Sequence, residues 1–254
     1  MEDSSVIDHD RQAEAVAQSL PWQVKICGIT TPEQGRAIAH LGADLLGFIC
    51  VQASPRYVTP AQIRAIAQAI PSPTQRIGVF VNAAIDEIVA TVAAGGLTGV
   101  QIHGEESPEF CDRLRQALAA AQSSAGLPPT SRVSLIKAFR LQHPAQISQT
   151  EGYGDRVDAF LLDAYHPTHH GGTGLTLDWQ PLQTFAPPVP WFLAGGLTPD
   201  NVQAAIALAQ PHGIDLSSGV ERSPGQKDLQ KVAHLFTQLR SALADRSPNR
   251  STDR

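Results

Sequence analysis

The sequence predicts a single α/β domain folded as a (β/α)8 barrel. Eight short segments, most of them apolar at every position, alternate with segments of helical pattern, which is typical of a parallel sheet covered by helices. The chain has 254 residues, and eight strand-helix units close a barrel at a typical length of about 250 residues. A doubly wound open sheet is the alternative that the same alternation allows.

Each predicted strand ends in a polar or glycine-rich cluster. The first strand begins at Gln23 and stops at Cys27-Gly28, and the other seven span residues 43–49, 76–81, 99–102, 133–139, 157–162, 191–194 and 213–216. The active sites of barrels lie at the carboxyl ends of their strands. We therefore expect these clusters to meet on one face of the molecule.

The predicted helices begin at strong N-terminal signals. Thr31, Thr59, Ser107 and Thr198 are hydroxyl N-caps, each followed by proline at the first helical position. These and weaker signals predict helices over residues 32–41, 60–70, 84–94, 108–121 and 226–244, another after Thr198, and a weakly signalled one within 143–151. Residues 122–132 are rich in Ser, Pro and Gly and are expected to form a loop.

Composition excludes several classes of function. The net charge of −5 and the absence of a basic run argue against nucleic-acid and membrane-surface partners. No apolar stretch approaches the roughly 20 residues of a membrane span. The three cysteines are far apart in the sequence, so neither a disulfide framework nor a zinc cluster is indicated, and a reducing cytoplasm fits best.

The two ends of the chain differ from its middle. Residues 1–20 carry acids where a signal peptide carries a basic start and an apolar core, and they are expected to form a flexible extension. Residues 246–254 form a polar tail, which leaves residues 21–245 as the barrel.

Cys27 is the first candidate for chemistry. Lys25 lies on the same face of the strand and would favour the thiolate, whereas an inert buried cysteine is the simpler alternative. Asp163 is in phase with the inward positions of the sixth strand and is a candidate acid, with Asp215 a weaker one. A structural aspartate that caps a loop is the alternative for both.

Glycine-rich clusters predict an anion site. Gly195-Gly196 and Ser217-Ser218-Gly219 end neighbouring strands, where barrels commonly bind phosphate with loop amides. Tight turns alone would explain either cluster. The segment 171–174 is interpreted as a loop that folds over the ligand.

The remaining candidates are basic side chains. Arg56 follows the second strand and is suited to bind a carboxylate, although a solvated surface arginine fits equally well. His103 is either a polar wall of the site or a strand-end histidine. His166, His169 and His170 suggest a metal, but no acid or cysteine accompanies them at ligand spacing, so no metal is predicted.

Together these motifs closely resemble phosphoribosylanthranilate isomerase of tryptophan biosynthesis, over about residues 24–244. The segments that carry the resemblance are KICGIT from Lys25, SPRY from Ser54, GVFVN from Gly78, QIHGE from Gln101, LDA from Leu162 with GGTG from Gly171, and DLSSGVE from Asp215. The departures from the family are the residues before Pro21, the loop at residues 122–132 and the tail from Arg246.

The resemblance implies a (β/α)8 barrel that works without a cofactor. It implies an Amadori rearrangement of N-(5′-phosphoribosyl)anthranilate to 1-(2-carboxyphenylamino)-1-deoxyribulose 5-phosphate. Cys27 then matches the general base and Asp163 the general acid, and Arg56 matches the residue that binds the anthranilate carboxylate. The phosphate-binding positions are Gly195, Gly196, Ser218 and Gly219. His103 and Asp215 are expected to contact the substrate, and the protein is expected to be a monomer or a homodimer.

Three other functions compete with this one. A histidine-pathway aminoaldose isomerase would carry an aspartate at the end of the first strand, where this chain has Cys27. A phosphosugar-binding barrel without activity is the alternative from another class, although both proton-transfer candidates are present. A fused bifunctional enzyme is disfavoured because 254 residues leave no room for a second domain.

Overall fold

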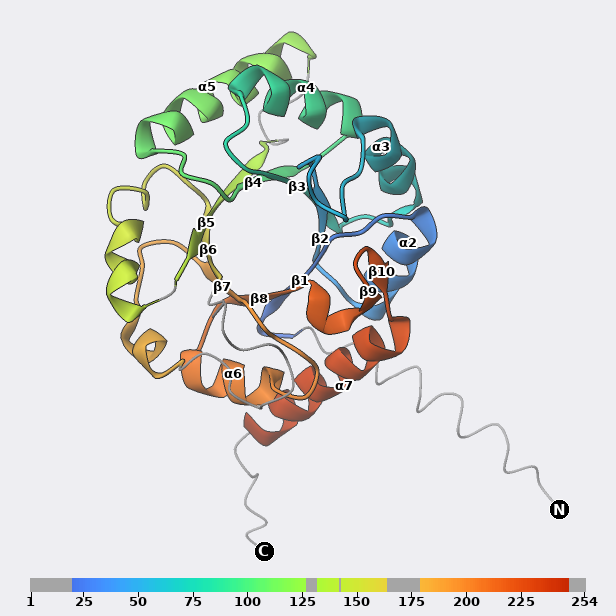
Figure 1. Cartoon of the computed structure of the whole chain (residues 1–254), viewed down its shortest axis with the longest axis vertical. Helices are drawn as coiled ribbons and strands as arrows, with labels where there is room; N and C mark the ends of the chain where they lie inside the picture. The colour runs from blue at the N-terminus through green and yellow to red at the C-terminus, as the bar shows by residue number, and fades with distance from the viewer. Residues whose placement is uncertain (1–19, 127–131, 142, 164–178, 247–254) are drawn as a thin grey trace, which may run out of the picture.

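The computed structural model of the chain describes residues 20–126, 132–141, 143–163 and 179–246. Within them eight parallel strands pair in sequence order and close into a barrel, because β1 pairs with both β2 and β8. Figure 1 shows the strands as a central ring with the helices outside it. The predicted barrel is confirmed, and the open-sheet alternative is wrong.

The strands of the barrel are short. They are β1 (Gln23–Cys27), β2 (Leu45–Ile49), β3 (Gln75–Phe80), β4 (Gly99–Ile102), β5 (Ser134–Arg140), β6 (Ala159–Asp163), β7 (Trp191–Ala194) and β8 (Gly213–Leu216). The predicted strands agree with these to within two residues at either end, since isolated apolar positions next to a strand belong to the turns that enter it.

The outer layer contains six α-helices and two long 3-10 helices in the described residues. They are α2 (Pro32–Leu41), α3 (Pro60–Ala69), α4 (Ile85–Gly95), α5 (Pro108–Ser124), η2 (Pro144–Thr150), η3 (Gln180–Thr184), α6 (Val202–Ala209) and α7 (Leu229–Arg246). The hydroxyls of Thr31, Thr59 and Ser107 accept hydrogen bonds from the backbone N–H three residues on, as predicted.

Four helix predictions need correction. The helix expected after Thr198 begins only at Val202, because Thr198 N donates to Asn201 Oδ1 at 2.8 Å and closes a turn first. The segment within 143–151 forms the 3-10 helix η2. The helix α5 continues to Ser124, into the segment predicted as loop.

The last predicted helix starts too early. Residues Gln226–Lys227 form strand β10, which pairs with β9 (Glu221–Ser223) in a short antiparallel hairpin. The helix α7 starts at Leu229, where Asp228 Oδ1 accepts from the N–H groups of Gln230 and Lys231. Figure 1 places this hairpin beside β1 and α2. Two side chains of this hairpin, Glu221 and Lys227, lie next to the site described below.

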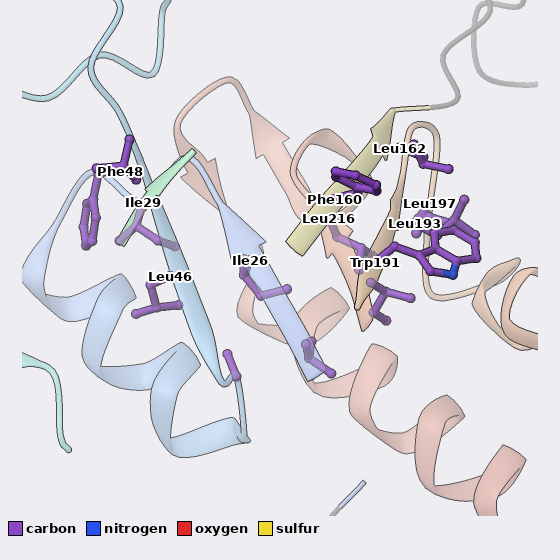
Figure 2. Packing of buried hydrophobic residues seen from close by; sticks show 14 of the residues in the cluster. Ile26, Ile29, Leu46, Phe48, Phe160, Leu162, Trp191, Leu193, Leu197 and Leu216 are labelled. Carbon is purple, nitrogen blue, oxygen red and sulfur yellow. The ribbon is translucent and has the colours of Figure 1, made fainter. Parts of the chain in front are cut away.

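Hydrophobic residues pack in two separate regions. The larger region lies between the strands and the helices, and Figure 2 shows part of it, with Ile26 from β1, Leu46 from β2 and Trp191 from β7. The smaller region fills the barrel itself with Leu45, Ile77, Ile136, Ala138, Ala159, Leu161, Phe192 and Ala194. Alternation along each strand sends every second residue inward, so Cys27, Asp163 and Asp215 share the inward side with these residues.

Several predicted segments lie outside the described residues. These are residues 1–19 of the N-terminal extension, residues 127–131 of the predicted loop 122–132, and the polar tail after Arg246. The segment 164–178, with His166, His169, His170 and the predicted closing loop, also lies outside them. Among the helices that the structure describes, none combines the length and apolar character of a membrane span.

Candidate active site

A cavity of about 260 Å³ opens at the carboxyl ends of the barrel strands. It is lined by residues from β1, β2, β3, β4, β6, β7 and β8 and from the loops that follow them. All nine residues predicted for catalysis and binding line it: Cys27, Arg56, His103, Asp163, Gly195, Gly196, Asp215, Ser218 and Gly219. The closed barrel therefore brings together residues spread over most of the chain.

Cys27 is the last residue of β1 and is 6 % exposed. A Cβ atom on Gly47 of the neighbouring strand would lie 2.6 Å from Cys27 Sγ, so the absence of a side chain at Gly47 makes room for the thiol. Burial raises the pKa of the Cys27 thiol, and the nearby positive charges of Lys25 and Lys227 offset this only in part. Lys25 therefore favours the thiolate, as predicted, but burial has the larger effect on the pKa of Cys27.

Lys25 forms an ion pair with Asp215, in addition to its position near Cys27. Its Nζ lies 3.0 Å from Asp215 Oδ2 inside the barrel, and the lysine side chain is 0 % exposed. Burial lowers the pKa of Lys25, but the ion pair with Asp215 outweighs burial and leaves the pKa raised. Lys25 thus carries a permanent positive charge beneath Cys27, and Asp215 is occupied as its counter-ion.

Asp163 ends β6 and is the more accessible of the two candidate acids, because its side chain is 23 % exposed. His103 Nε2 lies 3.5 Å from Asp163 Oδ2, and His103 Nδ1 lies 3.3 Å from Gln101 Nε2. His103 lines the cavity as a polar side chain, which is one of the two roles expected for it, and its Nε2 has no hydrogen-bond partner among the described residues.

Two buried acceptors in the cavity lack a hydrogen-bond partner among the described residues. They are Gln101 Oε1 and Asp215 Oδ1. Buried polar atoms are nearly always hydrogen-bonded, so these two are suited to accept from hydroxyl groups of a ligand. Gln101 was not predicted as a site residue. Its position two residues before His103 on the same strand face would have been sufficient to identify it.

The loops after β7 and β8, where an anion site is predicted, line the cavity together. Gly195 and Gly196 have φ of +92° and +66°, which favours glycine. Gly219 is required for a different reason, since a Cβ atom there would collide with the backbone carbonyl of Leu197. The two loops therefore pack backbone against backbone, and residues of both line the cavity.

Arg56 reaches the cavity from the loop after β2, but its guanidinium already has a partner. Nε lies 2.9 Å from Glu221 Oε1, and Nη2 lies 2.6 Å from Glu221 Oε2. Glu221 also accepts from Lys227 Nζ at 2.7 Å. Sequence reasoning assigned no role to Glu221 or Lys227, because the hairpin that carries them was not predicted.

Within the described residues no group of three or more histidine, cysteine or acidic side chains is arranged to hold a metal. The three histidines that suggested one belong to the segment outside those residues.

Known proteins resemble this chain along most of its length. The family model described as N-(5'phosphoribosyl)anthranilate (PRA) isomerase matches residues 24–238. The N-(5'-phosphoribosyl)anthranilate isomerase of Acaryochloris marina is 57% identical over 227 residues, which cover 87% of this chain and 99% of that protein. The protein of the same name from Gloeothece citriformis is 55% identical over 217 residues, which cover 85% and 93%.

Solved structures agree. The phosphoribosyl anthranilate isomerase of Thermotoga maritima matches with a TM-score of 0.75 at 32% identity, over 87% of this chain and 99% of the other. A structure of such an isomerase in complex with reduced 1-(o-carboxyphenylamino)-1-deoxyribulose 5-phosphate matches with a TM-score of 0.70 at 31% identity, over the same shares. The family model, the relatives and the shared barrel lead to one conclusion: the chain belongs to the N-(5′-phosphoribosyl)anthranilate isomerase family.

Proposed function

We propose that this protein converts N-(5′-phosphoribosyl)anthranilate to 1-(2-carboxyphenylamino)-1-deoxyribulose 5-phosphate, an Amadori rearrangement in the biosynthesis of tryptophan. The observation that carries the proposal is the single cavity in which a candidate base, a candidate acid and two groups of anion ligands meet. An aldose-to-ketose isomerisation needs one proton delivered to the ring oxygen and one removed from the adjacent carbon.

Asp163 is the general acid of the proposed mechanism. Its proton goes to the furanose ring oxygen as the bond from that oxygen to C1′ breaks and the anthranilate nitrogen forms an iminium with C1′. The exposure of Asp163 and its contact with His103 support this role. Asp215 is less suited to it, because its Oδ2 already contacts Nζ of the buried Lys25 at 3.0 Å and its side chain is only 9 % exposed.

Cys27 is the general base. It takes the proton from C2′, the electron pair moves toward the iminium nitrogen, and the resulting enol tautomerises to the ketone of the product. Thiolate is the form that accepts the proton. The charges of Lys25 and Lys227 near Cys27 support its formation. These steps move only protons and electron pairs within one substrate, so they use no cofactor.

The two ends of the substrate are held by different groups. The phosphate is bound by backbone N–H groups of the loops that contain Gly195, Gly196, Ser218 and Gly219. The carboxylate is bound by Arg56, and the sugar hydroxyls donate to Gln101 and Asp215, whose unpaired acceptors support these contacts. Fixing both ends holds C2′ and the ring oxygen against the base and the acid.

Growth of a tryptophan auxotroph that lacks this isomerase tests the proposal. The chain should restore growth, and variants Cys27→Ser and Asp163→Asn should not. A histidine auxotroph run in parallel tests the aminoaldose alternative. If the protein accumulates in soluble form yet restores neither strain, the phosphosugar-binding barrel without activity becomes the better explanation. The cytoplasmic location and the monomeric or homodimeric state stay predictions, to be tested by fractionation and light scattering.

A further inference from the structure

The hairpin of β9 and β10 places two buried charged side chains behind Arg56. The side chain of Glu221 is 4 % exposed and that of Lys227 is 0 % exposed. Charged side chains are rarely this deeply buried unless they are paired. The proposed chemistry uses Lys227 only as a positive charge near Cys27 and assigns Glu221 no role. Their position next to the cavity therefore calls for an explanation.

Glu221 occupies one particular edge of the Arg56 guanidinium. Its carboxylate accepts from Nε at 2.9 and 3.2 Å and from Nη2 at 2.6 Å. A guanidinium has five N–H groups in a fixed plane. The contacts with Glu221 leave both N–H groups of Nη1 and one of Nη2, which together form the second edge for bidentate binding of a carboxylate. Arg56 lines the cavity and is 22 % exposed at its side chain.

Glu221 is itself fixed from several directions. Lys227 Nζ donates to Oε1 at 2.7 Å, and the N–H of Gly225 in the hairpin turn donates to the same oxygen at 3.1 Å. Lys227 also donates to the carbonyl of Ser217 at 3.2 Å, which ties the hairpin to the loop after β8. Oε1 of Glu221 thus accepts from Arg56, Gly225 and Lys227, and Oε2 accepts from Arg56. These contacts determine the orientation of the carboxylate before a ligand binds.

The backbone of β1 leaves space for this arrangement. Gly28 has a φ of +84°, and a Cβ atom there would lie 2.8 Å from Arg56 Cδ and 3.4 Å from Lys227 Nζ. The arginine stem therefore passes directly over the backbone that follows Cys27. Two cations share one carboxylate in this cluster, so one positive charge is left uncompensated at the wall of the cavity.

We propose that Glu221 is a positioning residue for substrate binding: with Lys227 it fixes the inner edge of Arg56, so that the outer edge presents two parallel N–H groups to the substrate carboxylate. The inference rests on the proposed function, in which Arg56 binds that carboxylate. Without Glu221 the guanidinium would have to give up rotamer freedom at the moment of binding, which weakens affinity.

The variant Glu221→Gln tests the role, with two inhibitors as probes. One is reduced 1-(2-carboxyphenylamino)-1-deoxyribulose 5-phosphate, and the other is the same compound without the carboxyl group. Loss of a charge-assisted contact corresponds to a roughly tenfold or larger loss of affinity. We expect this loss for the first inhibitor and little change for the second, with KM raised and kcat nearly unchanged. Equal weakening of both inhibitors would overturn the proposal.

A double-mutant cycle separates positioning from general stability. In an Arg56→Ala background Glu221→Gln should have little further effect on KM, since its effect passes through Arg56. Arg222→Ala, on the same hairpin with a side chain 65 % exposed, is the matched control and should behave like the parent. An additional loss in the Arg56→Ala background would mean that Glu221 acts only on the fold.

Two further measurements make the outcome independent of turnover and of folding. Glu221→Asp keeps the charge for Lys227 but shortens the side chain, so it should fold and still lose part of the carboxylate-dependent affinity. Crystal structures of the two variants should show the Arg56 guanidinium turned away from the position it has in a crystal structure of the parent. If the Arg56 guanidinium keeps its position in both variants, the positioning role is contradicted. If the parent itself shows no turnover of the substrate, the proposed function is contradicted instead.

Discussion

At the scale of single residues, the environment of Cys27 decides how the site works. Burial makes the thiol a weaker acid, while Lys25 and Lys227 favour the thiolate and Asp215 opposes it. The pKa of Cys27 thus depends on the balance between burial, which raises it, and the charges around the thiol. The rate should therefore respond to pH and to the loss of any one of these charges.

The first prediction concerns this response. If the Cys27 thiolate is the base, as proposed, then because burial raises the pKa of Cys27, kcat/KM should increase with pH and still be increasing near pH 8.5, where an ordinary thiol is about half ionised. Lys25→Met removes a favourable charge and should move the rising limb to higher pH. The measurement is a pH profile of kcat/KM for both proteins. A profile that is flat from neutral to alkaline pH would remove Cys27 from the role of base.

The second prediction concerns the acid. Asp163→Asn keeps the shape of the side chain but has no acidic proton to deliver, so kcat should fall by about 10² to 10⁴ with KM changed far less. Steady-state kinetics with purified protein measures this. The control is His103→Gln, which keeps a polar group facing Asp163 and should cost much less. If Asp163→Asn turns over like the parent, the acid must be sought again, with Asp215 the next candidate.

At the scale of elements, the phosphate end depends on two loops that touch through their backbones. Gly219 approaches the carbonyl of Leu197 so closely that no side chain fits between them. A side chain at position 219 would therefore have to separate the two loops.

The third prediction follows from this contact. Gly219→Ala should push the loop after β8 away from the loop after β7 and break hydrogen bonds to the phosphate, so KM should increase by roughly tenfold to a hundredfold. Gly152→Ala is the control: it has a positive φ of +81° but lies outside the cavity lining, and its Cβ would meet only Pro108 at 3.8 Å. Unchanged KM in Gly219→Ala would show that these amides do not bind the phosphate.

The same elements show what sequence patterns can predict. The barrel, its strands and the nine cavity residues followed from apolar runs that end in polar clusters, since closure of the barrel collects strand ends wherever they occur in the chain. The β9–β10 hairpin was missed because its two strands are only three and two residues long and mostly polar, so no apolar alternation marks them. Without the hairpin, Glu221 and Lys227 could not be assigned a partner.

The charged partners around Cys27 and Arg56 were harder to predict than the positions of these two residues. Sequence phase places Lys25 on the same face as Cys27, but it does not reveal that Asp215, far along the chain, takes the lysine as its ion-pair partner. In the same way the position of Arg56 suggested that it could bind a carboxylate, but it did not reveal that Glu221 binds one edge of the guanidinium. Charge pairing between distant segments depends on register, which the strand pattern alone does not define.

At the scale of the whole molecule, the barrel contains three buried pairs of lysine and carboxylate, two of which connect segments far apart in the sequence and one of which lies within the β9–β10 hairpin. Lys25–Asp215 lies inside it, Lys227–Glu221 lies beside the site, and Lys137–Glu106 joins β5 to the loop after β4. Glu106 also accepts from the N–H groups of Asn82 and Gly104, and its side chain is 2 % exposed. A buried pair stabilises little in net terms, but loss of one partner is costly.

The last prediction uses Glu106, which contributes to the fold without lining the cavity. Burial raises the pKa of Glu106, but the hydrogen bond and charge of Lys137 and the backbone N–H of Asn82 outweigh burial and lower the pKa below its ordinary value of 4.5. A carboxyl group whose pKa is lower in the folded state stabilises the fold at pH above its unfolded pKa. That contribution is lost as the pH falls through the folded value. The free energy of unfolding should therefore decrease as the parent is acidified below pH 4.5.

Glu106→Gln cannot titrate and leaves Lys137 without its counter-ion. It should lower the free energy of unfolding at neutral pH by about 3–5 kcal/mol, and its stability should depend less on pH in the acid range. Urea unfolding at a series of pH values measures both effects, with the exposed neighbour Glu105→Gln as the control. If Glu106→Gln and the parent lose stability in parallel between neutral pH and acid, the Glu106 carboxylate does not link stability to pH, and the acid sensitivity of the fold must come from another of the buried pairs.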